Sequence, residues 1–120
     1  FWESSMIAIQ HKLDNLTVIV DANDLQGLDR TSDLVPRTWN SMFSAWGCMT
    51  LDVDGHDYAA LINAFATPTS DTPKVIVART SKAKGVSFME NKLEWHYKSC
   101  NPEQYAQARK ELEEPCAKPL

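Results

Sequence analysis

Hydrophobic positions along this chain alternate between two spacings, one typical of helices and one typical of buried strands. Apolar side chains recur every three or four positions in three stretches, which predicts amphipathic helices over residues 2–13, 39–46 and 58–65. Three short runs are mostly apolar and contain β-branched residues, which predicts strands covered on both faces at 16–20, 48–53 and 74–78. Because helices separate the strands, we expect an α/β fold in which a parallel sheet carries helices on both faces.

Polar boundary residues support this order of elements. Asp57 stands at the N-cap position of the third helix, and Gly47 ends the second. The stretch 80–100 follows neither period, which predicts a long loop of the kind that is often functional in compact domains. Asn101 and Pro102 begin a charged final helix, because proline is tolerated at the first helical position. The segment 115–120 is expected to form a tail.

Composition and charge narrow the class of protein. The 120 residues are 43% hydrophobic and 23% charged, with four Gly and six Pro, which is typical of one globular domain. Twelve basic and sixteen acidic residues give a net charge of −4, so we expect no electrostatic binding of nucleic acid. The apolar runs are shorter than the ~20 residues that span a bilayer, so we expect no membrane segment.

The cysteines and the first residues add two expectations. Cys48, Cys100 and Cys116 are odd in number and form no C-x-x-C pair, which favours free thiols in a reducing cytoplasm over disulfides or a zinc site. The chain opens at Phe1 with neither Met nor the pattern of a signal peptide. We therefore interpret it as a piece of a longer polypeptide.

Ligands of parallel sheets bind beyond the carboxyl ends of the strands, so candidate chemistry is sought there. The predicted strand ends are 21–23, 52–54 and 79–80. The first of them continues as Asp-Ala-Asn-Asp-Leu-Gln over residues 21–26, which is rich in amide, carboxylate and carbonyl oxygens. Oxygen ligands of this kind suit Mg²⁺. The same residue types also favour an ordinary turn, so the segment alone leaves both interpretations open.

Five segments, in order and spacing, resemble the cofactor-binding (pyrophosphate) domain of transketolases, and most closely the N-terminal subunit of split transketolases. They are Trp2-Glu3, 12–26, 53–57, 82–91 and Trp95-His96. The resemblance implies a thiamine diphosphate-binding fold, of which residues 1–114 would form the C-terminal part. The Gly-Asp-Gly triplet that opens the family's metal motif would lie upstream of Phe1 and is absent from this chain.

The resemblance also implies roles for individual residues. Asn23, through its side-chain oxygen, and Leu25, through its backbone carbonyl, match the Mg²⁺ ligands of the cofactor site. Lys82 matches a lysine that approaches the cofactor, where a cation suits the diphosphate. His96 matches a histidine that contacts cofactor and substrate, and it is the catalytic candidate because imidazole moves protons near neutral pH. Glu3 matches a carboxylate network near the subunit interface, although it could equally favour a helix dipole.

Other positions depart from the family or have plainer explanations. Ala83 replaces a glycine of the Lys-Gly-Lys-Gly loop, which restricts the backbone if a positive φ is needed. Tyr97 replaces the glycine after the Trp-His pair, and residues 27–30 lack the usual Asp-Gly order. His56 matches the family pattern, but a role in a turn before a helix explains it better. The aromatic residues of the helical stripes are expected to be core.

For function, the resemblance implies a transketolase-like subunit that transfers a two-carbon ketol unit between a ketose phosphate and an aldose through thiamine diphosphate and Mg²⁺. The glutamate that activates the cofactor would come from a pyrimidine-binding partner subunit or domain, in a dimer of heterodimers. This stretch alone is expected to be inactive. The alternatives are another thiamine diphosphate enzyme, such as a deoxyxylulose phosphate synthase or a 2-oxoacid dehydrogenase component, and a truncated, non-catalytic assembly partner.

Overall fold

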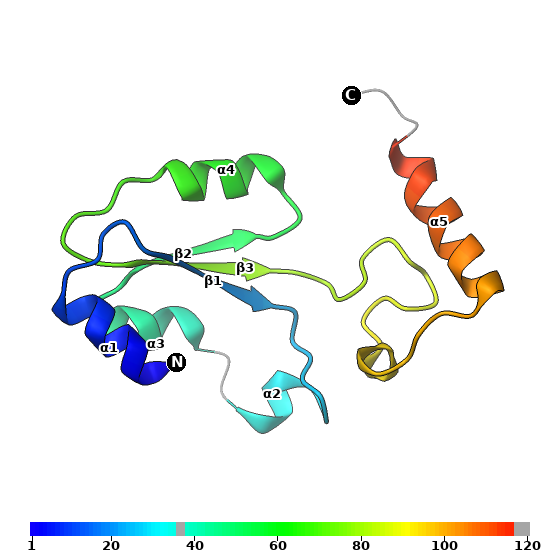
Figure 1. Ribbon diagram of the computed structural model, residues 1–120, viewed down its shortest axis with the longest axis horizontal. Helices are drawn as coiled ribbons and strands as arrows, with labels where there is room; N and C mark the ends of the chain where they lie inside the picture. The colour runs from blue at the N-terminus through cyan, green and yellow to red at the C-terminus, as the bar shows by residue number, and fades with distance from the viewer. Residues whose placement is uncertain (36–37, 117–120) are drawn as a thin grey trace. The chain divides into compact units, whose positions relative to one another are not determined.

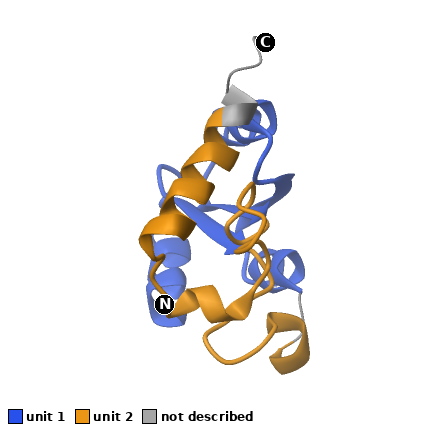
Figure 2. Ribbon diagram, turned by 90° about the vertical axis from the view of Figure 1, so that its right-hand side faces the viewer, with its two compact units in different colours: residues 1–22, 37–80 blue, residues 23–36, 81–120 orange. Residues whose placement is uncertain are grey.

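The computed structural model describes residues 1–35 and 38–116, with side chains up to residue 113. The chain divides into two compact units, which are coloured separately in Figure 2. Unit 1 consists of residues 1–22 and 37–80, and unit 2 consists of residues 23–36 and 81–120. The chain passes from unit 1 into unit 2 directly after the first strand and again after the last one.

Unit 1 is a three-stranded parallel sheet with helices on both faces, as the sequence predicts. The strands β1 (Thr17–Ala22), β2 (Met49–Asp54) and β3 (Lys74–Arg79) lie in the order β1-β3-β2. Both neighbours pair in parallel with β3, so that Ile76 lies opposite Ile19 on one side and Leu51 on the other. Figure 1 shows that α4 (Tyr58–Ala66) covers one face, and the other carries the two helices α1 (Trp2–Gln10) and α3 (Trp39–Ala45).

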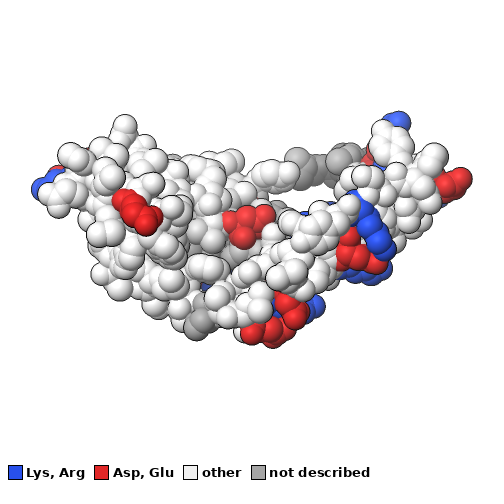
Figure 3. Space-filling model, turned by 60° about the horizontal axis from the view of Figure 1, so that its bottom comes forward, with Lys and Arg blue, Asp and Glu red and all other residues white. Residues whose placement is uncertain are grey.

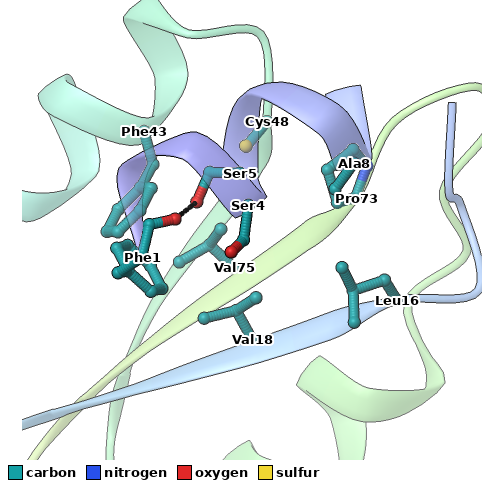
Figure 4. A pocket seen from close by; sticks show the side chains of 10 residues that line it. All are labelled: Phe1, Ser4, Ser5, Ala8, Leu16, Val18, Phe43, Cys48, Pro73 and Val75. Carbon is teal, nitrogen blue, oxygen red and sulfur yellow. Dashed lines mark hydrogen bonds between the residues drawn. The ribbon is translucent and has the colours of Figure 1, made fainter. Parts of the chain in front are cut away.

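The core of unit 1 is built around β3, whose five first residues are all buried. Val75, Ile76 and Val77 are no more than 1% exposed, and Phe43 of α3 packs against this strand together with Cys48. A small apolar cavity of about 80 Å³ lies beside them under α1 (Figure 4). The burial of this continuous apolar strand supplies the main hydrophobic stabilisation of the sheet.

The prediction that every strand is covered on both faces was wrong for the outer two. In β1 partly buried and exposed positions alternate, and Ile19 is 55% exposed. Strand β2 likewise exposes Asp52 and Asp54. The reason is the strand order, because in the described chain β1 and β2 lie at the edges and only β3 has a strand on each side.

The expectation that the aromatic stripes are core holds for Phe43 of α3 but not for α4. Phe43 is 2% exposed, whereas Tyr58 is 83%, Ile62 66% and Phe65 50% exposed. The periodic pattern did predict the helix correctly. It does not say what lies against each apolar position, and Ala64 is the residue of α4 that the structure buries.

Local capping explains where α4 begins and ends. The Asp57 carboxylate accepts hydrogen bonds from the backbone N–H groups of Ala59 and Ala60, as its N-cap position predicts. At the other end the buried Lys74 ammonium donates to the carbonyl oxygens of Ala64 and Phe65, at 3.1 and 2.8 Å. A cation on these last carbonyls satisfies groups that have no partner within the helix.

Unit 2 holds two short helical turns and one longer helix. The turns are α2 (Thr31–Leu34) and the 3₁₀ helix η1 (Leu93–His96), of which η1 interrupts the predicted long loop and α2 was not predicted. Helix α5 (Pro102–Cys116) starts with reciprocal hydrogen bonds between Asn101 and Gln104, a polar cap of both backbone N–H groups. It extends two residues beyond the expected boundary at 114, and residues 117–120 lie outside the described part.

Two further expectations concern cysteines and membranes. Burial raises the pKa of the Cys48 thiol, while Cys100 is exposed; both are free cysteines. The Cys116 side chain lies outside the described residues. In the described part of the chain, no helix combines the length and apolar character that crossing a bilayer requires.

Candidate functional site

The first candidate segment, the loop 23–30, follows β1 directly and folds back on itself. Asn23 Oδ1 accepts a hydrogen bond from the Leu25 N–H at 2.9 Å, and Leu25 forms an isolated antiparallel bridge with Arg30. The Gln26 N–H donates to the Asp29 carbonyl at 2.9 Å, which leaves Gly27 and Leu28 at the tip. The side-chain oxygen of Asn23 and the backbone of Leu25 are therefore held side by side at the base of the loop.

Asp24 organises this loop, and sequence reasoning missed its role. Its φ of 62° lies in the left-handed region, which Asp and Asn tolerate better than most residues. The Asp24 carbonyl accepts the Thr31 N–H at 2.9 Å, and its carboxylate accepts the Ser32 N–H and pairs with Arg30 at 3.4 Å. An Asp between two expected metal ligands was the available signal, because that residue type favours such turns.

The donors on this loop fit Mg²⁺ and are too few to hold it alone. Asn23 Oδ1 accepts the Leu25 N–H, and a neutral amide oxygen is one of the ligand types that Mg²⁺ takes in proteins. The Leu25 backbone carbonyl is a second neutral oxygen on the same loop. No group of three or more His, Cys, Asp or Glu that could bind a metal occurs in the part of the chain that the structure describes. Asn23 and Leu25 thus offer two of the six ligands that Mg²⁺ prefers.

The second candidate segment carries Lys82 and begins just after β3. The Lys82 carbonyl accepts the Asn91 N–H at 3.0 Å, which closes a compact run of turns over residues 82–91. Glu90 stabilises the turn from within, because its carboxylate accepts the Gly85 N–H at 3.2 Å. Ala83 has a φ of 54°, so the position where the family carries glycine does require a left-handed backbone here.

Replacing Ala83 by glycine is expected to stabilise the protein. An L-residue in the left-handed region costs about 1–2 kcal/mol, and glycine avoids that cost. Glycine also gains conformational freedom in the unfolded chain, which cancels about 0.4–1 kcal/mol of this stabilisation. The free energy of unfolding is therefore expected to rise by about 0.5–1 kcal/mol. Denaturant unfolding measures it. Ala106→Gly on the exposed face of α5 is the control with the opposite sign, and equal effects of both variants would contradict the prediction.

The third candidate segment is η1 and the residue that follows it. Trp95 anchors it, because its indole N–H donates to the Phe88 carbonyl at 3.0 Å and the two rings pack edge to face. This contact fixes η1 on the turns that begin at Lys82. His96 is exposed, and its ring meets the Tyr97 ring edge-on with centroids 4.7 Å apart. The Tyr97 hydroxyl donates to the Gly27 carbonyl at 2.8 Å, at the tip of the loop 23–30.

Four of the five predicted site residues share one unit. Asn23, Leu25, Lys82 and His96 all lie in unit 2, where the contact between Tyr97 and Gly27 brings His96 beside the loop 23–30. No hydrogen bond or ion pair between described residues connects Lys82 to that loop. Glu3 lies in unit 1, in the first turn of α1, with its side chain 89% exposed.

The strand ends of unit 1 carry an ion pair that sequence reasoning did not single out. Arg79 at the end of β3 donates two hydrogen bonds to Asp52 of β2, at 2.6 and 2.8 Å. The hydrogen bond from Arg79 is the largest cause that lowers the pKa of the Asp52 carboxyl, and Asn40 of α3 adds another. On the same strand Asp54 accepts the His56 N–H at 2.8 Å, which fits the expected turn.

The face drawn in Figure 3 carries charged side chains of both signs. Asp and Glu atoms form separate groups there, some of them with Lys and Arg atoms beside them, and the basic atoms form no continuous patch. This distribution fits the net charge of −4. It offers no electrostatic footprint for a phosphate backbone on that face.

Comparison with known proteins links this fold and these segments to transketolases. The chain is 33% identical over 116 residues to an apulose-4-phosphate transketolase subunit of Phocaeicola vulgatus, covering 94% of this chain and 41% of that protein. The protein of the same name from Actinobacillus succinogenes is 31% identical, with 94% and 42% covered. The transketolase of Campylobacter jejuni superposes with a TM-score of 0.85 at 27% identity, over 93% of this chain and 18% of that one. No family model matches the sequence.

The resemblance stated from the sequence is therefore confirmed. The chain is a relative of the transketolases, which are transferases, and it spans about two fifths of the length of its split-transketolase relatives. Its parallel sheet with helices on both faces has the fold of the corresponding part of a transketolase.

Proposed function

We propose that this chain supplies the diphosphate- and metal-binding part of a transketolase that moves a two-carbon ketol unit from a ketose phosphate to an aldose. The observation that carries the proposal is the loop 23–30, which presents the Asn23 amide oxygen and the Leu25 backbone together. The relatives named as apulose-4-phosphate transketolase subunits support the reaction class.

In this proposal each predicted residue has a separate task. Asn23 and Leu25 hold Mg²⁺ through neutral oxygens, and Lys82 offsets the charge of the diphosphate. When bound, thiamine diphosphate would supply a nucleophilic carbon and an electron sink, which breaking and re-forming the substrate bond beside the ketose carbonyl requires. His96 donates protons to substrate hydroxyls and accepts protons from them near neutral pH. Glu3 contributes to a carboxylate network at the subunit interface.

The proposal includes a partner that completes the site. Two oxygens do not fill the coordination shell of Mg²⁺, and this chain spans about two fifths of relatives whose own names describe one part of a transketolase. We therefore propose that a pyrimidine-binding transketolase subunit or domain provides the rest, in a dimer of heterodimers. Residues 1–114 form the C-terminal part of the diphosphate-binding domain in this arrangement. The free thiols of Cys48 and Cys100 fit a cytoplasmic location.

A donor and acceptor panel tests the reaction. The full-length protein, assembled with its partner, is expected to transfer ketol units between sugar phosphates only when thiamine diphosphate and Mg²⁺ are both present. Release of CO₂ from pyruvate without ketol transfer would instead favour a deoxyxylulose phosphate synthase or a 2-oxoacid dehydrogenase component. Cofactor-independent assembly without any turnover would favour a non-catalytic partner. The 120-residue chain alone is expected to be inactive.

A further inference from the structure

One contact in unit 2 joins residues seventy positions apart. The Tyr97 hydroxyl donates a hydrogen bond of 2.8 Å to the Gly27 carbonyl, and the Tyr97 and His96 rings pack edge to face with centroids 4.7 Å apart. Gly27 lies at the tip of the loop whose base carries Asn23 and Leu25. A single side chain therefore contacts both the loop with the proposed metal ligands and the proposed catalytic histidine.

The backbone at Gly27 is shaped for this contact. A Cβ atom at that position would lie 2.7 Å from the Tyr97 hydroxyl oxygen and 3.8 Å from His96 Nε2. Among the glycines that the structure describes, positive φ values occur at Gly47 and Gly85 but not at Gly27. A side chain at position 27 would therefore displace the Tyr97 hydroxyl, whereas the backbone conformation of Gly27 does not itself need glycine.

We propose that Tyr97 is a positioning residue that fastens η1 to the loop 23–30 and so holds the His96 imidazole beside the tip of the loop whose base carries the proposed metal ligands. The inference rests on the proposed function for the role of His96, whereas the physical link between the two segments stands without it. An exposed histidine has several rotamers, and a displacement of about 1 Å can cost a catalytic group on the order of 100-fold in rate. The hydroxyl and ring contacts of Tyr97 restrict the rotamers that the His96 side chain can adopt.

The first measurement is amide hydrogen exchange on the full-length, assembled protein without cofactor. Tyr97→Phe keeps the ring against His96 and removes the hydroxyl that donates to Gly27. Exchange of the peptide covering residues 23–30 is expected to rise about three- to tenfold, in line with the loss of one hydrogen bond. Tyr58→Phe is the matched control, because this hydroxyl lies on the exposed face of α4 in unit 1 and should leave the peptide unchanged.

A double-mutant cycle tests whether the contact is direct. Gly27→Ala alone would push the Tyr97 hydroxyl away and should raise exchange in the peptide covering residues 93–100. In the Tyr97→Phe background the same alanine meets no hydroxyl, so its effect should be at least about threefold smaller, because residues in contact are not additive. Additive effects of the two substitutions would overturn the proposed link.

The enzyme assay separates positioning from simple stability. With saturating cofactor, Tyr97→Phe is expected to lower kcat per bound cofactor about tenfold while KM for the ketose donor changes less than about twofold. Unchanged kcat per bound cofactor, with a lower melting temperature, would overturn the positioning role. If exchange responds as expected but the unsubstituted enzyme transfers no ketol unit, the proposed function fails and the link between Tyr97 and Gly27 stands.

Discussion

Replacing Ile76 by alanine is expected to lower the free energy of unfolding by about 3–4 kcal/mol. Ile76 is 0% exposed and sits in the middle of β3, where it is paired on both sides. The cavity left by the lost side chain cannot collapse, because hydrogen bonds to β1 and β2 fix the strand from either edge. Urea unfolding followed by circular dichroism would show a lower midpoint with an unchanged slope.

Ile19 is a matched control for this substitution. It is the register partner of Ile76 on β1 and has the same chemistry, but it is 55% exposed. Ile19→Ala is therefore expected to cost less than about 1 kcal/mol, since little apolar area is lost from the interior. If the two variants destabilised the chain equally, β3 would not be the centre of its core.

The contrast between these two isoleucines shows how far the hydrophobic pattern could predict the fold. The runs at 16–20, 48–53 and 74–78 predicted all three strands to within two residues, because short apolar runs with β-branched residues, set between helical segments, favour strands. Which run became the central strand depends on pairing between distant segments. Local periodicity carries no information about this pairing. The sequence therefore predicted burial on both faces for all three strands, and the structure shows a continuous buried run in β3.

Helix α4 also shows that periodicity predicts an element but not its burial. Its spacing and the Asp57 cap predicted the helix correctly, yet Tyr58 and Phe65 remain exposed. A stripe of apolar residues indicates a face that gains from burial. Whether another segment covers that face is decided by the tertiary arrangement, and the sequence of the helix does not contain it.

The sequence indicated some features of the candidate site and missed others. The resemblance to transketolases paired Asn23 with Leu25, and the structure joins the two residues by one hydrogen bond. Ala83, the departure from the family's glycine, has a positive φ. The bond from Tyr97 to Gly27 could not be predicted, because it spans seventy residues and needs the loop 23–30 to fold back first. A bulky residue in place of the family's glycine was its one visible signal.

Asn23→Ala is expected to weaken Mg²⁺-dependent binding of thiamine diphosphate to the assembled, full-length protein by at least about 100-fold. Loss of residues that merely orient metal ligands costs about 10–100-fold in affinity, so loss of a direct ligand should exceed that range. Asn23 also accepts the Leu25 N–H, and the substitution frees the second proposed ligand as well. Calorimetric titration of cofactor at saturating Mg²⁺ measures the change.

Two further variants decide whether the effect comes from the metal or from the turn. Asn23→Asp keeps an oxygen that accepts the Leu25 N–H and binds Mg²⁺, so its affinity should stay within about tenfold of the unsubstituted protein. Asn63→Ala removes an exposed amide from α4 and should change nothing. If Asn23→Ala bound cofactor as tightly as Asn63→Ala, the loop 23–30 would not carry the metal. The site would then have to be sought among other oxygens of the assembly.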